Sequence, residues 1–248
     1  MKTRPLLTRL LYRARDFRSR ALFRVLREHA SGALLDVGGG DFFQSVRDQG
    51  LRFTRWTTLE VDARDLPARD DPRLSVVVGD GCALPFAAYS FDTVLSVQVL
   101  EHVFEPIRMV QEIGRVLRPG GKAVLLIPQT STTHLAPHYH GNFSRYWIQT
   151  ALARADLELV QHLPLGGVWS SMASHQFYFF LQAMRVKGMS DPAIRRSALF
   201  WLLLPFMVLW ALVSLPVCLF LSLGDLAEEP NNHLVVARRG EVSSRGNS

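Results

Sequence analysis

Cysteine is scarce in this sequence of 248 residues, and the two that occur, Cys82 and Cys218, stand in unlike contexts. They offer no disulfide framework, so we expect a chain that works in a reducing compartment. The basic start lacks the apolar core and small-residue cleavage site of a secretory leader, so none is expected. No internal repeat is visible, which argues against a solenoid or another repeat array.

Acidic residues are nearly absent from the first 30 positions, which hold eight arginines and one lysine against Asp16 and Glu28. This excess contributes to a net charge of +6 and favours an anionic partner, either a membrane surface or a nucleic acid. Within residues 5–29, apolar side chains recur at steps of three and four, which predicts an amphipathic helix. That helix either packs its apolar stripe on the rest of the protein or lies on anionic lipid.

Charge is missing altogether from residues 198–223, a run of 26 residues that contains Pro205 and Pro216. The run exceeds the roughly 20 residues needed to cross a bilayer, so it predicts a membrane-associating segment. A pair of buried helices in a soluble protein is the alternative. The chain then divides into a basic helix at 1–30, a core at 31–165, an insertion at 166–230, a last core strand at 231–240 and a disordered tail at 241–248.

The middle of the sequence alternates short apolar runs with helical stretches such as Ile107 to Leu117, which Pro119-Gly120-Gly121 ends in a turn. Such alternation is typical of an α/β fold, a doubly wound parallel sheet with helices on both faces. The candidate strands are Ala33–Val37, Trp56–Val61, Leu74–Val78, Thr93–Val97, Lys122–Ile127, Leu157–Leu163 and, far downstream, His233–Ala237.

The segment Gly38-Gly39-Gly40 follows the first candidate strand and opens a helix, an arrangement that lets the backbone approach a ligand closely. It is not the dinucleotide pattern G-x-G-x-x-G, because Phe43 stands where the third glycine would be. Glu60 closes the second strand, where an acid can accept both hydroxyls of a ribose, and Asp80 closes the third. Acids at successive strand ends predict a ligand-binding crevice at one edge of the sheet.

Four motifs follow one another in order along the core. They are GDGCALPF at 79–86, SFDTV at 90–94, LEHV at 100–103 and EIGRVLRPGG at 112–121. Together they resemble the type 11 class I S-adenosylmethionine-dependent methyltransferases, which carry an acid before Leu-Pro-Phe, a Phe-Asp before the fourth strand and Pro-Gly-Gly before the fifth. The resemblance implies a Rossmann-like sheet of seven strands, with the last strand inserted antiparallel between the fifth and the sixth.

The same resemblance assigns a cofactor, S-adenosylmethionine, to the predicted crevice. Asp36, Gly38 and Gly40 would line its methionine moiety, Glu60 would hold the ribose and Asp80 the adenine amine. Ser96 or Gln98 would form the bottom of the pocket, and Gly81 and Cys82 are further cofactor-binding candidates. Phe42 departs from the family, which usually has a further glycine there. A bulky side chain at this position either narrows the site or turns away from it.

Methyl transfer from a sulfonium needs alignment of the acceptor, and a base only where the acceptor must lose a proton. The candidates on the acceptor side are His102, after the fourth strand, and His138, His140 and Arg145, after the fifth. His102 has the alternative interpretation of an ordinary residue at a helix start. No metal is expected from the spacing of His134, His138 and His140, because neither cysteine nor carboxylate accompanies them.

Three functions fit these features. The first is a methyltransferase whose acceptor is a lipid, a quinone, a glycolipid or another small molecule met at the membrane. The second is a methyltransferase with a soluble acceptor and a membrane anchor, and the third is a non-catalytic membrane-attached binding module. The intact acids at three strand ends favour catalysis, and we expect it at the cytoplasmic face of the cell membrane. No nucleic-acid partner is expected, since no base-reading module accompanies the arginines. The sequence does not predict an oligomeric state.

The apolar run at 198–223 is expected to enter the membrane and return to the same side, either as a shallow hairpin or as interfacial helices. By the resemblance, the strands on either side of it share one sheet and therefore one compartment. Pro205 and Pro216 provide places to bend, and Trp201 and Trp210 suit the interface. The flanking charges, basic before the run and acidic after it, would by themselves favour a single crossing.

Overall fold

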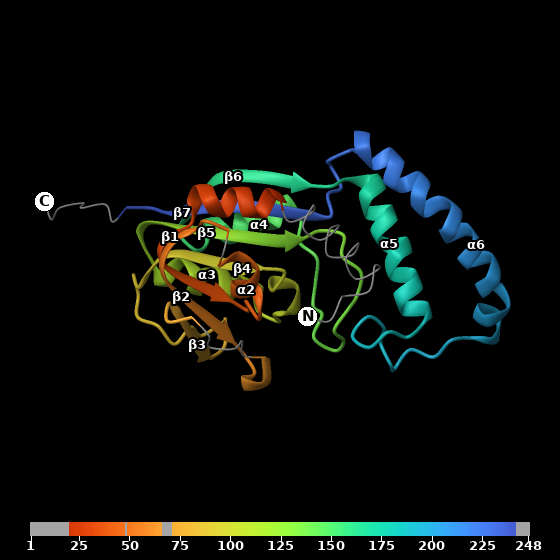
Figure 1. The fold of residues 1–248 in the computed structure, drawn as a ribbon, viewed down its shortest axis with the longest axis horizontal. Coiled ribbons are helices and arrows are strands. Elements are labelled where there is room, and N and C mark those ends of the chain that lie inside the picture. The colour runs from red at the N-terminus through yellow and green to blue at the C-terminus, as the bar shows by residue number, and fades with distance from the viewer. Residues whose placement is uncertain (1–19, 48, 66–70, 242–248) are drawn as a thin grey trace, which may run out of the picture.

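The computed structural model describes residues 20–47, 49–65 and 71–241. One seven-stranded sheet runs through the molecule in the order β3-β2-β1-β4-β5-β7-β6 (Figure 1). All seven candidate strands belong to this sheet, and most are longer than predicted. The strands are β1 (Ser31–Val37), β2 (Arg52–Glu60), β3 (Leu74–Val78), β4 (Phe91–Val97), β5 (Leu117–Pro128), β6 (Leu157–Leu165) and β7 (Asn232–Arg239).

The last strand runs antiparallel to both of its neighbours, β5 and β6, whereas β1 to β5 pair in parallel. This arrangement confirms the Rossmann-like fold and the place of the last strand. Leu165, at the end of β6, pairs with Asn232, at the start of β7. The chain between these two residues therefore leaves the sheet and returns to it at one point.

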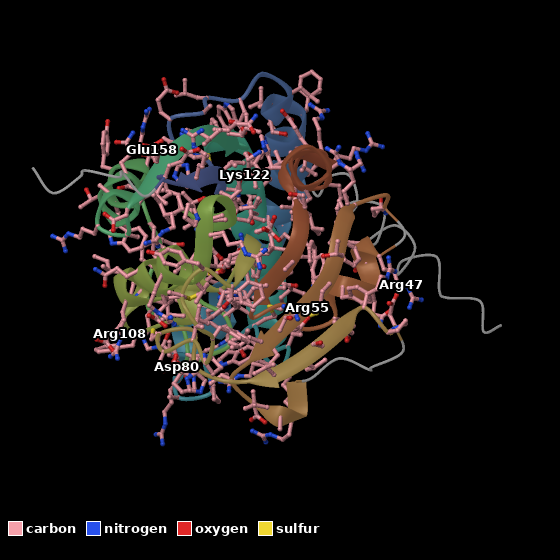
Figure 2. The ribbon with its side chains drawn as sticks, turned by 90° about the vertical axis from the view of Figure 1, so that its left-hand side faces the viewer. Arg47, Arg55, Asp80, Arg108, Lys122 and Glu158 are labelled. Atoms are coloured by element: carbon pink, nitrogen blue, oxygen red, sulfur yellow. The ribbon has the colours of Figure 1, made fainter. Side chains whose placement is uncertain are left out.

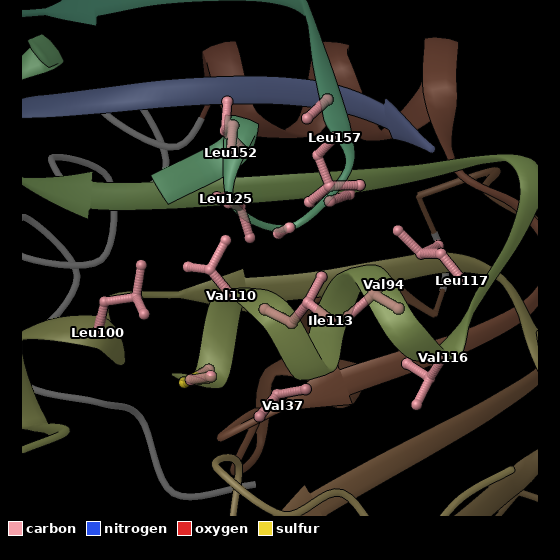
Figure 3. Close-up of a cluster of buried hydrophobic side chains, with 14 of the residues drawn as sticks. Val37, Val94, Leu100, Val110, Ile113, Val116, Leu117, Leu125, Leu152 and Leu157 are labelled. Atoms are coloured by element: carbon pink, nitrogen blue, oxygen red, sulfur yellow. The ribbon is translucent and has the colours of Figure 1, made fainter. Parts of the chain in front are cut away.

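The central strands are buried on both faces, as the near-continuous apolar runs in the sequence predict. In β1, Leu35 and Val37 point into one core cluster and Leu34 points into the other. The first cluster packs two helices, α3 (Pro106–Val116) and α4 (Arg145–Ala153), against the sheet (Figure 3).

The opposite face is covered by a helix at residues 20–29 and by the short helix α2 (Phe42–Val46). Leu22, Val25 and Leu26 are buried there. Within the described residues, the basic helix thus packs its apolar stripe on the sheet. The rest of the predicted helix, residues 5–19, and the predicted tail beyond residue 241 lie outside the described residues.

The segment after α3 differs from the prediction in one detail. The helix ends at Val116, and Leu117 already pairs with Phe91 of β4, so Pro119-Gly120-Gly121 lies within β5. The register between β4 and β5 shifts before the next pair, Thr93 with Lys122. The three residues therefore form a bulge in the strand, with Gly120 at a φ of 75°.

The insertion between β6 and β7 consists of α5 (Val168–Ala183), α6 (Ala198–Leu221) and the 3-10 turn η3 (Ser222–Gly224), which stand to one side of the sheet (Figure 1). The predicted hairpin within residues 198–223 is wrong, because Pro205 and Pro216 both lie inside one continuous helix. The chain reverses instead between α5 and α6, at residues 184–197. By length and composition α6 is the one described helix that could span a membrane.

The two helices of the insertion pack antiparallel through a few polar contacts. In the middle, the Ser214 hydroxyl donates to Gln176 Oε1 at 2.7 Å. At the end near the sheet, the Asp225 carboxylate after α6 accepts the backbone N–H groups of Trp169 and Ser170 at the start of α5. At the far end, Arg196 donates to backbone carbonyls in the last turn of α5. Polar contacts therefore connect α5 and α6 at both ends and in the middle.

Candidate functional site

The glycine turn after β1 lies against two other elements at the carboxyl edge of the sheet. Gly38 has a φ of 71°, and a Cβ there would come within 2.7 Å of the Val99 side chain. A Cβ on Gly39 would overlap the carboxylate of Asp36. Gly40 has a φ of 46°. The turn therefore needs glycine for backbone conformation and for space.

Asp36 is fully buried near the end of β1, and neither of its carboxylate oxygens has a hydrogen-bond partner among the described residues. Burial raises the pKa of Asp36 well above its usual value, and the neighbouring Glu60 carboxylate raises it further. The Trp56 side chain offsets a part of this rise. Such an acid costs stability where it stands, which is a common property of functional sites.

Glu60 and Asp80 lie at the ends of the next two strands, as predicted. Glu60 accepts the Gly40 N–H at 2.5 Å, which joins the acid at the end of β2 to the glycine turn. Its backbone carbonyl accepts the N–H of Gly79, the residue before Asp80. Asp80 is exposed (Figure 2), and one of its carboxylate oxygens accepts the Cys82 N–H. The three predicted acids thus lie along one edge of three neighbouring strands.

The remaining predicted cofactor residues surround this edge. Gly81 packs closely on Val37, and Cys82 is buried with its thiol donating to the Glu105 carbonyl. Ser96, near the end of β4, is buried and its hydroxyl has no hydrogen-bond partner among the described residues. Gln98 has a φ of 57° and donates through its amide to the Asn232 side chain at 2.6 Å, which ties β4 to β7.

Phe42, the departure from the family pattern, turns away from the glycine turn. Its ring stacks on Phe23 with a centroid separation of 6.4 Å and an interplanar angle of 15°, and it lies 6.4 Å from the Trp56 ring. All three side chains belong to the core on the face that carries the basic helix. The aromatic side chain therefore fixes that helix to the sheet and does not narrow the edge.

A cluster of polar rings lies beside the turn, after β4. His102 belongs to the 3-10 turn η2 (Leu100–His102), and its ring meets that of His134, from the loop after β5, at 4.8 Å and 90°. The Tyr139 ring packs on both. Burial lowers the pKa of His102, against the opposing effect of the His138 carbonyl. His102 thus lies in a short helical turn with Nδ1 hydrogen-bonded, and its ring also belongs to this cluster, so its part in acceptor binding stays a prediction.

Glu101, which was not among the predicted site residues, lies beside this cluster. Its carboxylate is fully buried, has no hydrogen-bond partner among the described residues, and lies 4.0 Å from His102 Nε2. Burial raises the pKa of Glu101 to about 7. Its signal was present in the motif Leu100-Glu101-His102, where an acid next to a histidine follows a buried strand.

The other predicted acceptor-side residues divide into two groups. His138 and His140 enter the cluster through their backbones, because His102 Nδ1 contacts the His138 carbonyl and the His140 N–H donates to the Glu101 carbonyl. Their side chains are exposed. Arg145 starts α4 at the surface, where its charge lowers the pKa of His162 and His233 instead.

Comparison with known proteins matches part of the chain to one family. Residues 35–125 match the family described as "Methyltransferase domain". An uncharacterized methyltransferase of Mycobacteroides abscessus is 41% identical over 101 residues, which cover 37% of this chain and 38% of the relative. The chain therefore matches well under half the length of this curated relative.

Solved structures share the fold at low sequence identity. A Haloferax volcanii protein described as a methyltransferase, in complex with the Trm112 methyltransferase activator, superposes with a TM-score of 0.59 at 18% identity, covering 91% of this chain and 92% of that one. Phosphoethanolamine N-methyltransferase 2 of Haemonchus contortus, bound to phosphomonomethylethanolamine and S-adenosylhomocysteine, gives 0.54 at 14% identity, covering 91% and 52%.

Proposed function

Because residues 35–125 match the methyltransferase domain family, we propose that this chain transfers a methyl group from S-adenosylmethionine to a lipid-like acceptor met at a membrane surface. When bound, that cofactor supplies a methyl group already activated on a positively charged sulfur. The observation that carries the proposal is the meeting of Asp36, Glu60 and the glycine turn at one edge of the sheet.

The residues at this edge fit the proposed cofactor. A Cβ at Gly38 would collide with the Val99 side chain, and one at Gly39 with the Asp36 carboxylate, so these glycines let the turn pack closely on both side chains. At Gly40 only the Glu60 carboxylate lies within 4 Å of the place of a Cβ, so the backbone there is open to a ligand. The Asp36 carboxylate and the Ser96 hydroxyl are buried polar groups that a ligand can supply with a partner. Glu60 is held at the turn by the Gly40 N–H, where it can accept ribose hydroxyls.

Cofactor binding is the test of this site. We expect the full chain in detergent to bind S-adenosylmethionine and S-adenosylhomocysteine with micromolar affinity in calorimetry, roughly −7 to −9 kcal/mol. Glu60→Ala is expected to weaken binding by about 1–3 kcal/mol, the scale of a lost charged hydrogen bond. Glu158→Ala, on the exposed edge strand β6, is the matched control. A folded chain that binds neither compound would contradict the proposal.

A membrane-borne acceptor is supported by the surface of α6. Its side chains that face α5 are small, Ala211, Ser214 and Cys218, while large apolar side chains cover the rest. The exposed ones include Leu202, Phe206, Leu209, Trp210 and Phe220. An apolar surface of this extent is unfavourable in water and suits the acyl boundary of a bilayer.

The helix pair also contacts the loop after β5, which contributes His134 and Tyr139 to the ring cluster around His102, here called the histidine cluster. Gln182 of α5 donates to the Thr133 carbonyl at 3.2 Å, and the Leu135 N–H donates to the Gly188 carbonyl in the connection between the helices. Exposed Arg185 and Lys187 in that connection suit anionic headgroups. An acceptor leaving the membrane beside α5 would therefore reach the histidine cluster directly.

The acceptor class can be tested with a labelled methyl donor. The chain is incubated with a membrane lipid extract in one reaction and with an aqueous metabolite extract of the same cells in another. We expect transferred label in the lipid fraction. Label confined to the aqueous fraction would instead mean a soluble acceptor, with the helix pair serving as an anchor.

A further inference from the structure

Three potential metal ligands meet beside the glycine turn, from segments more than 30 positions apart. One ligand atom each from Glu101, His102 and His134 lies within 4.8 Å of the others. The sequence argued against a metal because the histidines had no carboxylate partner. The fold supplies that partner, since η2 and the loop after β5 meet at this point.

Both imidazoles are held in the orientation that metal-binding histidines adopt. His102 Nδ1 lies 2.6 Å from the His138 carbonyl, and His134 Nδ1 lies 2.8 Å from the Thr132 carbonyl. A carbonyl oxygen only accepts, so each Nδ1 carries the hydrogen, and the neutral ring has its lone pair on Nε2. A backbone carbonyl that fixes the tautomer in this way is the usual outer-shell partner of a metal ligand.

The third group is the buried carboxyl group of Glu101. Both oxygens of Glu101 are buried and lack a hydrogen-bond partner among the described residues. An isolated buried carboxylate is costly, and coordination of a cation is one of the few ways to offset that cost. His102 Nε2, the nitrogen with the lone pair, is the ring atom that faces it, at 4.0 Å.

We propose that Glu101, His102 and His134 bind a divalent transition-metal cation of the zinc class. Two imidazoles and one carboxylate suit such an ion, whereas magnesium and calcium prefer oxygen ligands throughout. Zinc holds its ligand atoms at about 2.1 Å, so two ligand atoms of a tetrahedral site are about 3.4 Å apart. The ligand atoms of the three side chains must therefore approach one another by roughly 1 Å when the ion binds. Three protein ligands leave a coordination position open.

The position of Glu101, His102 and His134, here called the triad, suggests that the open coordination position binds the methyl acceptor. This role rests on the proposed methyl transfer. Val99, the residue before η2, packs on Gly38, so the triad stands next to the glycine turn that lines the proposed methionine end. An acceptor hydroxyl bound to the cation would have a lowered pKa. Its proton would pass to solvent, and the oxygen would form the new O–CH₃ bond as the S–CH₃ bond breaks. S-adenosylhomocysteine would leave as a neutral thioether that keeps the electron pair of the broken bond.

Metal binding is tested independently of methyl transfer. Full-length protein without a histidine tag is freed of metal and dialysed against Zn²⁺, and bound zinc is measured by mass spectrometry. We expect one zinc per chain, a higher Tm with zinc, and visible absorption bands when Co²⁺ replaces it. Glu101→Gln and His134→Ala should each weaken binding by at least about tenfold.

The controls separate a lost ligand from a lost fold and from a failed function. His175→Ala removes an exposed histidine of α5 and should bind zinc as the wild type does. Glu101→Gln keeps the side chain's shape, so circular dichroism should remain native while zinc no longer raises its Tm. Wild-type protein that takes up no stoichiometric zinc, or variants that bind it equally well, would overturn the proposal. Binding of S-adenosylhomocysteine, measured on the same samples, reports separately on the proposed function.

Discussion

Several residues at the carboxyl edge of the sheet lower the stability of the folded protein. Asp36, Ser96 and Glu101 each bury a polar group without a hydrogen-bond partner among the described residues. A buried polar atom left unpaired costs about 1–3 kcal/mol, more when it is charged. Their concentration beside one glycine turn is the arrangement that we expect of a binding site.

Gly39 is the residue where space alone decides the outcome. In Gly39→Ala the new methyl group would overlap the Asp36 carboxylate, so the turn must shift. We expect S-adenosylhomocysteine affinity to fall by at least about tenfold in calorimetry, on the scale of a few kcal/mol for overpacking. Gly224→Ala, at a glycine with nothing within 4 Å of the added methyl, is the matched control. Equal affinity in the two variants would show that the ligand does not depend on this turn.

At the scale of elements, β7 places a buried histidine in a chain of side-chain hydrogen bonds. His233 contacts Gln129 Oε1 through Nε2 at 2.7 Å and His162 through Nδ1 at 2.8 Å. Burial, and then the neighbouring His162, lowers the pKa of His233 to about 4. The folded protein thus keeps this histidine neutral at pH values where the unfolded chain would be protonated.

This difference predicts a loss of stability in acid. A histidine whose pKa is lower in the folded state makes its full contribution to the free energy of unfolding above about pH 6.5. This contribution is lost as the pH falls from about 6.5 to about 4, because the unfolded chain takes up the proton first. Between pH 7 and pH 4 the free energy of unfolding falls in both proteins. We expect the fall to be about 1–3 kcal/mol smaller in His233→Gln than in the wild type. Urea unfolding at the two pH values measures this, with the exposed His175→Gln as control. Parallel losses in all three proteins would contradict the prediction.

At the scale of the whole molecule, the helix pair gives the protein an apolar side. α5 has 16 residues, a length of about 24 Å, which is less than the roughly 30 Å hydrocarbon core of a bilayer. A full crossing would also carry Arg185, Lys187 and Arg195 to the far side. The pair is therefore expected to lie in the interface, with α6 against the lipid and the connection at the headgroups.

Vesicle binding tests this arrangement. Replacing Leu202, Phe206 and Leu209 together by Gln should reduce flotation with anionic vesicles by at least about tenfold, because burial of each side chain contributes about 1.5–3 kcal/mol. Val160→Gln, on the exposed edge strand β6, should float as the wild type does. If the wild type stays with the aqueous phase as a stable oligomer, the apolar face is a protein interface instead.

The side of the membrane can be read from a label in the connection between the helices. A single cysteine at Ser190, with Cys82 and Cys218 replaced by Ala, should react with an impermeant reagent added on the side of the sheet domain. A second label at Glu241, just beyond β7, is the reference for that side. Reaction of the Ser190 label from the opposite side alone would mean that both helices cross.

The amino-acid sequence by itself determined the sheet and most of the edge at which we propose the cofactor binds. Strands such as Leu74–Val78 are local apolar runs, and the glycine turn and the acids at strand ends follow them at fixed positions. Parallel topology then forces those ends to one edge, so their meeting needs no knowledge of packing. The roles of the individual site residues remain predictions.

Only the tertiary structure decided what depends on contacts between distant segments. Glu101 and His134 meet because η2 and the loop after β5 pack together, and the direction of the Phe42 ring depends on a helix that precedes the sheet. Pro205 and Pro216 do not break α6, since a proline removes one backbone hydrogen bond while the rest of the helix retains its own. Local patterns report backbone preferences and burial, whereas the partner of a side chain is set by the packing of the whole chain.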